Sequence, residues 1–327
     1  MTDKDLSYWM ALAHIGGWRT EKINRLVLAI LKEHRIGFEE FFALDPTARA
    51  EKFNLGPEDS RKLCALADEL PNYSFLAASL LDQGYRIIPL NSPDYSATLK
   101  DNLKLKYAPP VLYTKGNREL LDQQSVAIVG SRNASPVSLE FTEARARMAV
   151  ENGQLVVSGF APGVDRLALD TALKHKGKSI IVLPQGITTF VSGFREYYQQ
   201  IIEGDVLVLS AFHPNARWTA GLAMARNPII YGLANQIYVA DCQEKGGTWS
   251  GAIDGLRKGR TIFVRTPAPG EKSALNLLIE KGAIPIEPEY RVKHEEATTV
   301  KEEKPEYPGD RKDGAVNATQ PRLFTDT

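Results

Sequence analysis

The sequence predicts an α/β fold in which a doubly wound, mostly parallel sheet follows a small all-helical domain. Six continuous apolar runs alternate with amphipathic helical stretches between residues 121 and 290. Strands that are apolar throughout and separated by helices are typical of parallel sheets covered on both faces. Residues 1–72 instead repeat their apolar residues at helical spacing and contain no β-rich run. Glycines and polar residues gather where the predicted strands end, which is the edge at which such sheets bind ligands.

The overall composition limits the kinds of partner and compartment. The 327-residue chain has 40 Lys and Arg against 40 Asp and Glu, so its formal net charge is zero. No field over the whole surface would attract nucleic acid, and any polyanion site must be a local patch. The two cysteines, Cys64 and Cys242, are far apart and lack zinc-ligand spacing, which favours a reduced, cytoplasmic protein. No signal peptide and no run of about 20 apolar residues occurs, so we expect no membrane segment.

The first 72 residues are expected to form the helical domain. Apolar residues recur at helical spacing at Ile23, Leu26, Val27, Ile30 and Leu31. Two glycine-containing turns, within Ile15–Leu26 and Leu55–Leu66, resemble those of helix-hairpin-helix or SAM-like units. The backbone N–H groups of such turns can face a phosphate, but the glycines also permit a tight turn between packed helices, and we favour the packing role.

A connecting segment, residues 73–120, links this domain to the sheet. It holds short β-like runs at Arg86–Pro89 and Val111–Thr114. Pro109 and Pro110 exclude a long helix before the second run and hold the backbone extended. We therefore expect a lead-in that packs against the following domain.

Residues 121–290 are expected to form an extended Rossmann-like domain. Its strand candidates are SVAIVGS, QLVVSG, SIIVLP, DVLVLS, QIYVAD and TIFVRT, which start near residues 125, 154, 179, 205, 236 and 261. Between the first two, Phe141, Ala144, Met148 and Ala149 mark the apolar face of a helix.

The last part of the chain, residues 291–327, is predicted to be a disordered, charged tail. It is polar, punctuated by Pro and Gly, and nearly devoid of periodic apolar residues, so it cannot bury enough surface to offset its ordering entropy. Leu323 and Phe324 near its end are interpreted as part of this solvated tail rather than as a docking motif.

Thirteen residues near the predicted strand ends form the candidate binding site. The first strand ends in Gly-Ser-Arg, the second in a glycine turn followed by an aspartate, and the fifth in Lys-Gly-Gly-Thr, while an Arg-Asn pair precedes the fifth strand. In a parallel sheet these segments lie along one edge. The residues are Gly130, Ser131, Arg132, Ser158, Gly159, Gly163, Asp165, Arg226, Asn227, Lys245, Gly246, Gly247 and Thr248.

The residue types at this edge suit phosphate groups. Glycines let backbone N–H groups approach a ligand, and the following helices direct the positive ends of their dipoles toward it. The Arg132 guanidinium offers paired donors to phosphate oxygens, and Ser131 and Thr248 offer hydroxyl donors. Asp165 either interacts with the N–H groups at the start of its helix or contacts a ribose, a base or an arginine. The expected ligand is therefore a polyanion or a nucleotide phosphate.

Other site chemistries find little support in the sequence. Neither the G-x-G-x-x-G spacing of dinucleotide-binding folds nor the G-x4-G-K-[ST] spacing of P-loop proteins occurs, so we expect no bound cofactor. The five histidines are scattered without a nucleophile partner or metal-ligand spacing. We therefore expect no catalytic residue, no metal site and no enzymatic activity.

The order of these motifs resembles the DNA-processing protein A family, also called DprA or Smf. The resemblance covers about Leu6 to Ile286, and it is carried by AIVGSR, SGFAPGVDRLALDTAL, SIIVLPQGI, ARNPIIYGLANQIYVAD, KGGTWSGA and LNLLIEKGAIPI. It implies an extended Rossmann domain that binds and protects single-stranded DNA and loads RecA recombinase during natural transformation, commonly as a homodimer. By this resemblance, Gly130, Ser131 and Arg132 match the phosphate-contacting turn, and Arg226 and Asn227 begin an Arg-Asn-Arg segment.

Three positions depart from the pattern of the family. Pro162 stands where the second glycine motif has an arginine, Leu169 where a histidine follows it, and Pro228 where the last arginine of the Arg-Asn-Arg segment is expected. Each lost phosphate contact would lower both the affinity for a strand and its salt dependence. The lysines available to compensate are Lys174, Lys176, Lys178 and Lys245. The polar tail also has no counterpart of the winged helix found in many members.

These departures keep a second function open. KGGTWSGA is also similar to the Gly-Gly-x-Gly-Thr turn of the related LOG phosphoribohydrolases, and fewer arginines suit a small ligand better than a long strand. The catalytic glutamate of those enzymes is absent from the matching place. The alternative is therefore a nucleotide sensor or a nucleotide-processing enzyme. A continuous positive groove along the strand ends would favour the strand, and a closed pocket would favour the nucleotide.

Overall fold

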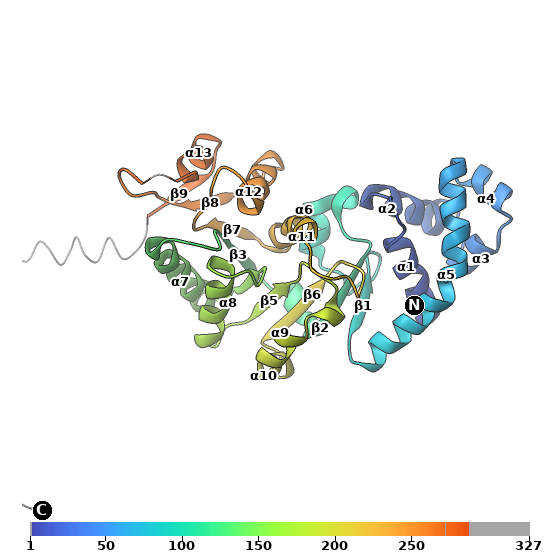
Figure 1. Ribbon diagram of the computed structural model, residues 1–327, viewed down its shortest axis with the longest axis horizontal. Coiled ribbons are helices and arrows are strands. Elements are labelled where there is room, and N and C mark those ends of the chain that lie inside the picture. Colours follow the sequence, from blue (N-terminus) through green and yellow to red (C-terminus); the bar gives the residue numbers. More distant parts are fainter. Residues whose placement is uncertain (1, 272, 288–327) are drawn as a thin grey trace, which may run out of the picture. The chain divides into compact units, whose positions relative to one another are not determined.

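The computed structural model describes residues 2–271 and 273–287 (Figure 1). The predicted tail at residues 291–327, with Leu323 and Phe324, lies outside these ranges. None of the helices in the described ranges has both the length and the apolar character needed to cross a membrane.

Two of the amino-terminal helices start at residues whose side chains satisfy free backbone N–H groups. Thr2 and Asp5 form a reciprocal capping box at the first helix, and the Asp45 carboxylate accepts hydrogen bonds from the N–H groups of Thr47 and Ala48 at the fourth. The elements are α1 (Asp3–Ala13), α2 (Thr20–Leu28), the π-helical turn η1 (Ala29–Glu33), α3 (Phe38–Ala43), α4 (Pro46–Lys52) and α5 (Pro57–Asp82).

The helical part and the sheet share one hydrophobic core. A single cluster of buried side chains runs from Tyr8 in α1 to Ala283 near the end of the described chain. Helix α5 packs along α1 and continues beyond residue 72, where the sequence predicts a domain boundary. The described residues fall within one compact unit, so the division of the chain at residues 72 and 120 stays a prediction.

A nine-stranded sheet organises the rest of the described chain (Figure 1). Its order is β1-β2-β6-β5-β4-β3-β7-β8-β9, with β2 antiparallel to both β1 and β6 and all other neighbours parallel. The strands are β1 (Arg86–Pro89), β2 (Val111–Gly116), β3 (Ser125–Val129), β4 (Leu155–Ser158), β5 (Ser179–Val182), β6 (Val206–Ser210), β7 (Gln236–Val239), β8 (Ile262–Arg265) and β9 (Ile284–Ile286). The mostly parallel sheet is confirmed, and so are the six predicted strands.

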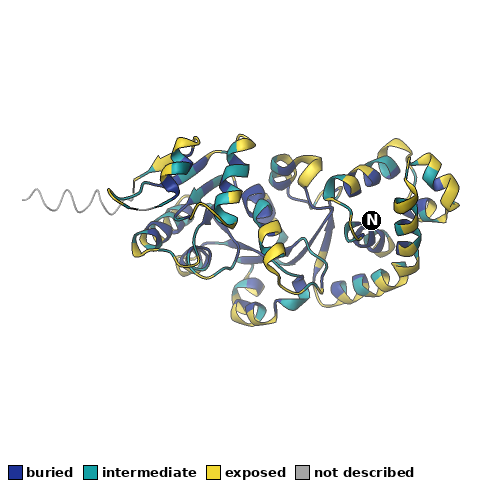
Figure 2. Ribbon diagram, turned by 45° about the horizontal axis from the view of Figure 1, so that its top comes forward, coloured by how far each residue is buried: buried dark blue, intermediate teal, exposed yellow. Residues whose placement is uncertain are grey.

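Helices cover both faces of the sheet because alternate strand side chains point to opposite faces. Val126 and Ile128 of β3 pack in one cluster with residues of α7 and α8, whereas Ala127 and Val129 belong to the larger cluster that includes α11. Figure 2 shows most of the sheet in the dark blue that marks buried residues. The helices are α6 (Ala97–Tyr107), η2 (Arg118–Asp122), α7 (Pro136–Glu151), α8 (Val164–Lys174), η3 (Ile187–Thr189), α9 (Val191–Glu196), α10 (Tyr198–Glu203), α11 (Ala220–Leu233), α12 (Gly247–Arg257) and α13 (Leu275–Glu280).

The chain reverses its direction of travel across the sheet at β3. From β3 it proceeds through β4, β5 and β6 on one side, and it returns to place β7, β8 and β9 on the other. The loops after β3 and β7 therefore diverge to opposite sides and leave a crevice between adjacent strand ends. In open α/β sheets this switch point is where ligands bind.

Candidate functional site

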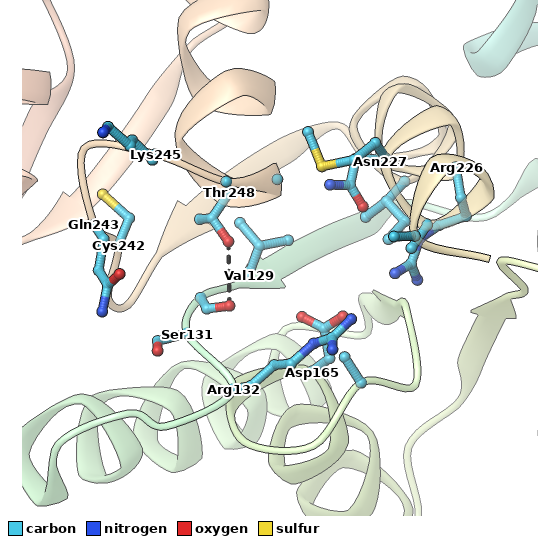
Figure 3. A pocket seen from close by; sticks show the side chains of 18 of the residues that line it. Val129, Ser131, Arg132, Asp165, Arg226, Asn227, Cys242, Gln243, Lys245 and Thr248 are labelled. Carbon is cyan, nitrogen blue, oxygen red and sulfur yellow. Dashed lines mark hydrogen bonds between the residues drawn. The ribbon is translucent and has the colours of Figure 1, made fainter. Parts of the chain in front are cut away.

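A pocket of about 430 Å³ occupies the crevice at the carboxyl ends of β3 and β7 (Figure 3). Its walls come mainly from the turn after β3, the first half of α11 and the turn between β7 and α12. Ten of the thirteen predicted site residues line it: Gly130, Ser131, Arg132, Asp165, Arg226, Asn227, Lys245, Gly246, Gly247 and Thr248. The structure therefore brings together residues from four separate segments of the chain.

Arg132 presents an unpaired guanidinium at the mouth of this pocket. Its side chain is exposed, and it makes no hydrogen bond or ion pair with any residue in 2–271 or 273–287. The turn that carries it is held from below by Gly163, which has φ +82°. A Cβ at Gly163 would lie 2.5 Å from the carbonyl oxygens of both Ser131 and Arg132, so only glycine lets the start of α8 approach this turn so closely.

Arg226 and Asp165 are buried groups of opposite charge that lie close together at the pocket. Arg226 Nη1 donates a hydrogen bond to the Val182 carbonyl oxygen at 3.0 Å, while its Nε has no partner within the described residues. Burial raises the pKa of Asp165, and the Arg226 cation together with nearby backbone N–H groups opposes that rise. Burial also lowers the pKa of Arg226, with Asp165 opposing it, and a guanidinium remains charged in proteins.

Two of the predicted residues support this pair and do not line the pocket of about 430 Å³. Gly159 lies directly against Arg226. A Cβ at this position would overlap the guanidinium and the Asp165 carboxylate, so only glycine leaves room for them. Ser158 is fully buried, and its hydroxyl donates a hydrogen bond to the Asp165 carbonyl oxygen at 2.6 Å. Their direct contact with a phosphate, like that of Gly163, stays a prediction.

The turn between β7 and α12 supplies the wall opposite Arg132 (Figure 3). Gly246, with φ +100°, precedes α12, and no side chain caps that helix within the described residues. Its first N–H groups, at Gly247 and Thr248, therefore border the pocket with the positive end of the helix dipole. Thr248 does not offer its hydroxyl hydrogen as the sequence suggests, because Oγ1 donates it to the Gly130 carbonyl oxygen at 3.1 Å. Lys245 is exposed at the rim.

A second pocket, of about 320 Å³, adjoins the first along the same edge. It lies beyond β4 and β5, where Gly159 to Pro162 and Pro184 to Thr189 supply part of its lining. Both pockets are lined by Arg132, Ala161, Trp218, Ala223 and Arg226. Together they pass four neighbouring strand ends, from β5 to β7, which spans about 14 Å at the usual strand spacing.

Sequence reasoning missed several residues that line this edge. Trp218 is 50% exposed and lines both pockets, and Gln185 lines the second. The exposure of Trp218 could have been predicted from the sequence. A lone tryptophan in a polar loop before a helix belongs to no periodic apolar pattern that would bury it. Among the lysines proposed to compensate for missing arginines, only Lys245 lines the first pocket. Lys174, Lys176 and Lys178 lie between the end of α8 and the start of β5, at the amino ends of the strands.

Comparisons with known proteins agree on one family. The sequence model of the family described as DNA recombination-mediator protein A matches residues 86–295, more than half of the chain. The chain is 33% identical over 178 residues to DNA processing protein DprA of Streptococcus pneumoniae, which covers 54% of this chain and 63% of that protein. It is 26% identical over 286 residues to Protein Smf of Synechocystis, covering 85% of this chain and 69% of that one.

Solved structures show the same fold. The X-ray structure of DNA processing protein A from Streptococcus pneumoniae aligns with a TM-score of 0.71 at 23% identity, over 90% of this chain and 98% of that one. DNA processing protein A from Helicobacter pylori, solved for its single-stranded DNA binding mode, aligns with a TM-score of 0.53 at 27% identity, over 65% of this chain and 96% of that one. Sequence match and fold thus lead to one conclusion: the chain belongs to the DNA recombination-mediator protein A family, that of the DprA and Smf proteins.

Proposed function

We propose that this protein binds single-stranded DNA, largely without sequence preference, along the groove formed by the two adjoining pockets. The observation that carries the proposal is the pair of arginines shared by both pockets. Arg132 makes no hydrogen bond or ion pair with any described residue, and the buried Nε of Arg226 has no hydrogen-bond partner among them. Arg226 also lines both pockets, so with Arg132 it adds positive charge along the groove, and charge-assisted hydrogen bonds from a guanidinium suit phosphate oxygens.

The length of the groove favours a strand over a single nucleotide. Two pockets in series along about 14 Å of sheet edge accommodate more than one phosphate, and Arg132 stands between them. Exposed Trp218 adds an aromatic face on which a base can stack. The Helicobacter pylori relative, which is described as binding single-stranded DNA, supports the same ligand class.

Each wall of the groove has a separate task in this proposal. Arg132 binds phosphate oxygens directly, and the N–H groups of Gly247 and Thr248 bind a second phosphate through the helix dipole. Asp165 balances the charge of the nearby buried Arg226 and does not contact the strand, because a carboxylate facing phosphates would repel them. Contacts to phosphate and sugar carry no sequence information, so binding is expected to be insensitive to base identity.

We further propose that the bound strand is passed to RecA recombinase in the cytoplasm, with this protein acting as a homodimer and without catalysis of its own. Membership of a recombination-mediator family supports this role. RecA filament formation on strands precoated with a single-strand-binding protein should proceed faster when this protein is added. Light scattering of the purified chain should give twice the monomer mass.

The strand-binding proposal predicts a specific salt dependence. Arg132→Ala should weaken binding of a fluorescent oligo-dT by about tenfold at low salt. It should also reduce the slope of log K against log salt by about 0.7, the value for one phosphate contact on a single strand. Fluorescence anisotropy over a salt series measures both quantities.

The matched control is Arg86→Ala, which removes another exposed arginine, from β1, five strands away from β3 in the sheet. It should leave the affinity and the slope unchanged. Oligo-dT binding that is absent at low salt, or equal in the wild type and Arg132→Ala, would contradict the proposal. Displacement of the oligomer by equimolar dTMP would favour the nucleotide-binding alternative.

A further inference from the structure

A strained turn at the end of α6 projects four consecutive side chains into solvent. Lys104 has φ 55° and ψ 176° inside the helix, a backbone conformation that is costly for any residue except glycine. The buried Asn24 side chain holds the turn, because its Nδ2 donates hydrogen bonds to the carbonyl oxygens of Leu105 at 2.7 Å and Ala108 at 2.9 Å. Residues 104–107 are all exposed as a result.

The turn meets the end of α12 at an exposed tyrosine. Tyr107 is 46% exposed, and the ammonium groups of Lys106 and Lys258 lie 5.3 Å and 4.2 Å from the centre of its ring. We call Lys104, Lys106, Tyr107 and Lys258 the Tyr107 platform. Lys258 pairs with the Asp254 carboxylate at 2.6 Å, and Asp101 lies three residues before Lys104 on α6. The four cations Lys104, Lys106, Arg257 and Lys258 outnumber these two carboxylates.

The platform is fixed to the same helices that build the candidate site. Helix α12 begins at the pocket, where Gly247 and Thr248 line it, and ends at Arg257 beside Lys258. Ten residues separate Thr248 from Lys258, which is about 15 Å of helix. Helix α11 packs against both α6 and α12, and Asn102 Nδ2 of α6 donates a hydrogen bond to the Gly232 carbonyl oxygen at 2.9 Å (Figure 1).

We propose that the Tyr107 platform is a second contact for the same single strand, which leaves the pocket beside Thr248 and follows α12 to reach it. This inference rests on the proposed function. An exposed ring flanked by cations is how proteins hold single strands without reading sequence: a base stacks on the ring and the cations contact the flanking phosphates. An acidic strand also complements the positive charge of this surface, and the strained turn places the ring and cations in advance.

The test compares a short and a long strand. The short oligo-dT has about 5 nucleotides, near the smallest site sizes of single-strand-binding folds, and the long one has about 20, beyond the largest. Tyr107→Ala should weaken binding of the long strand by about fivefold or more, whereas the short strand should bind as to the wild type. Tyr107→Phe should keep the affinity for both. Lys106→Ala combined with Lys258→Ala should weaken only the long strand and reduce its salt slope by about 1.4.

Two controls separate the possible failures. Phe75→Ala removes another exposed ring, from α5, and should change neither affinity, while thermal unfolding checks that each variant folds. If Arg132→Ala weakens both strands but the platform variants weaken neither, the platform proposal is wrong and the proposed function stands. Equal weakening of both strands by Tyr107→Ala would also overturn the platform as a separate contact. If Arg132→Ala has no effect on either strand, it is the proposed function that fails.

Discussion

At the scale of single residues, the site depends on glycines that permit close approach as much as on the arginines themselves. The start of α8 reaches the Ser131–Arg132 turn only because Gly163 has no Cβ, and the Val164 N–H then donates a hydrogen bond to the Ser131 carbonyl oxygen at 3.3 Å. Gly159 likewise leaves room for the Arg226 guanidinium. These glycines position the arginines, and their contribution to binding is therefore expected to be indirect.

Gly163→Ala should lower the free energy of unfolding more than Gly84→Ala, a matched glycine substitution. Both Gly163 and Gly84 have positive φ, at +82° and +76°, but a Cβ at Gly84 meets nothing within 4 Å. Gly84→Ala should therefore cost only the backbone strain, about 1 kcal/mol, and Gly163→Ala about 2 kcal/mol or more because overlap is added. Urea unfolding measures both. Equal losses of stability in the two variants would show that the Ser131–Arg132 turn shifts to accommodate the added Cβ with no further loss in the free energy of unfolding.

At the scale of elements, the groove is assembled by pinning the start of a helix to the end of a strand. The Thr248 hydroxyl ties α12 to the carbonyl group after β3, and Tyr231 of α11 donates a hydrogen bond to the Thr248 carbonyl oxygen at 3.2 Å. Three elements thus meet at one threonine. We expect these two bonds to fix the direction in which the α12 dipole points at the pocket.

Thr248→Val should loosen this junction at nearly constant side-chain volume. Loss of the hydrogen bond to Gly130 should lower the free energy of unfolding by about 1 kcal/mol and weaken oligo-dT binding severalfold. Thr248→Ser keeps the hydroxyl and should retain both properties. Urea unfolding and anisotropy are the measurements. Should valine and serine behave alike, the hydrogen bond does not position the helix.

The same elements show what sequence reasoning reaches. Continuous apolar runs revealed six strands, since a parallel strand buried on both faces has a strong local pattern. β9 was not predicted, because Ile284–Ile286 is a three-residue edge strand with mostly exposed side chains. The Arg226 to Val182 hydrogen bond joins residues 44 apart, and no local pattern encodes it. Lys174, one of the lysines expected to compensate, lines neither pocket because α8 carries it to the opposite end of the strands.

At the scale of the whole molecule, a cluster of histidine and tyrosine rings connects the amino-terminal helices to the sheet. His14, at the end of α1, has Nε2 2.8 Å from the Tyr113 hydroxyl of β2, and its ring contacts that of His213 at 5.2 Å. His213 lies in the loop after β6 that carries Trp218 to the groove. Burial and the neighbouring His213 lower the pKa of His14 to about 3.

The lowered pKa predicts a loss of stability on the acid side. In the unfolded chain His14 takes up a proton near pH 6.5, whereas in the folded protein it stays neutral down to about pH 3. The contribution of neutral His14 to the free energy of unfolding is therefore fully present above pH 6.5 and is lost as the pH is lowered from 6.5 toward 3. The loss from this group is at most about 1.4 kcal/mol per pH unit. Chemical unfolding at about pH 7 and pH 5 should show a smaller loss in His14→Phe than in the wild type. His175→Phe, at an exposed position, is the control, and equal losses in all three proteins would contradict the assignment.

The pairing of β3 with β7 determines at which stage of protein synthesis the groove can form. Ser125 and Asn235, which are joined at the start of these strands, are 110 residues apart, and Thr248 lies 118 residues beyond Gly130. Such distant contacts are expected to form late, whereas helices α1 to α5, which are synthesised before the sheet, pack through shorter separations. A nascent chain that ends before β7 therefore lacks one wall of the groove, and the proposed strand binding becomes possible only when translation of the sheet is nearly complete.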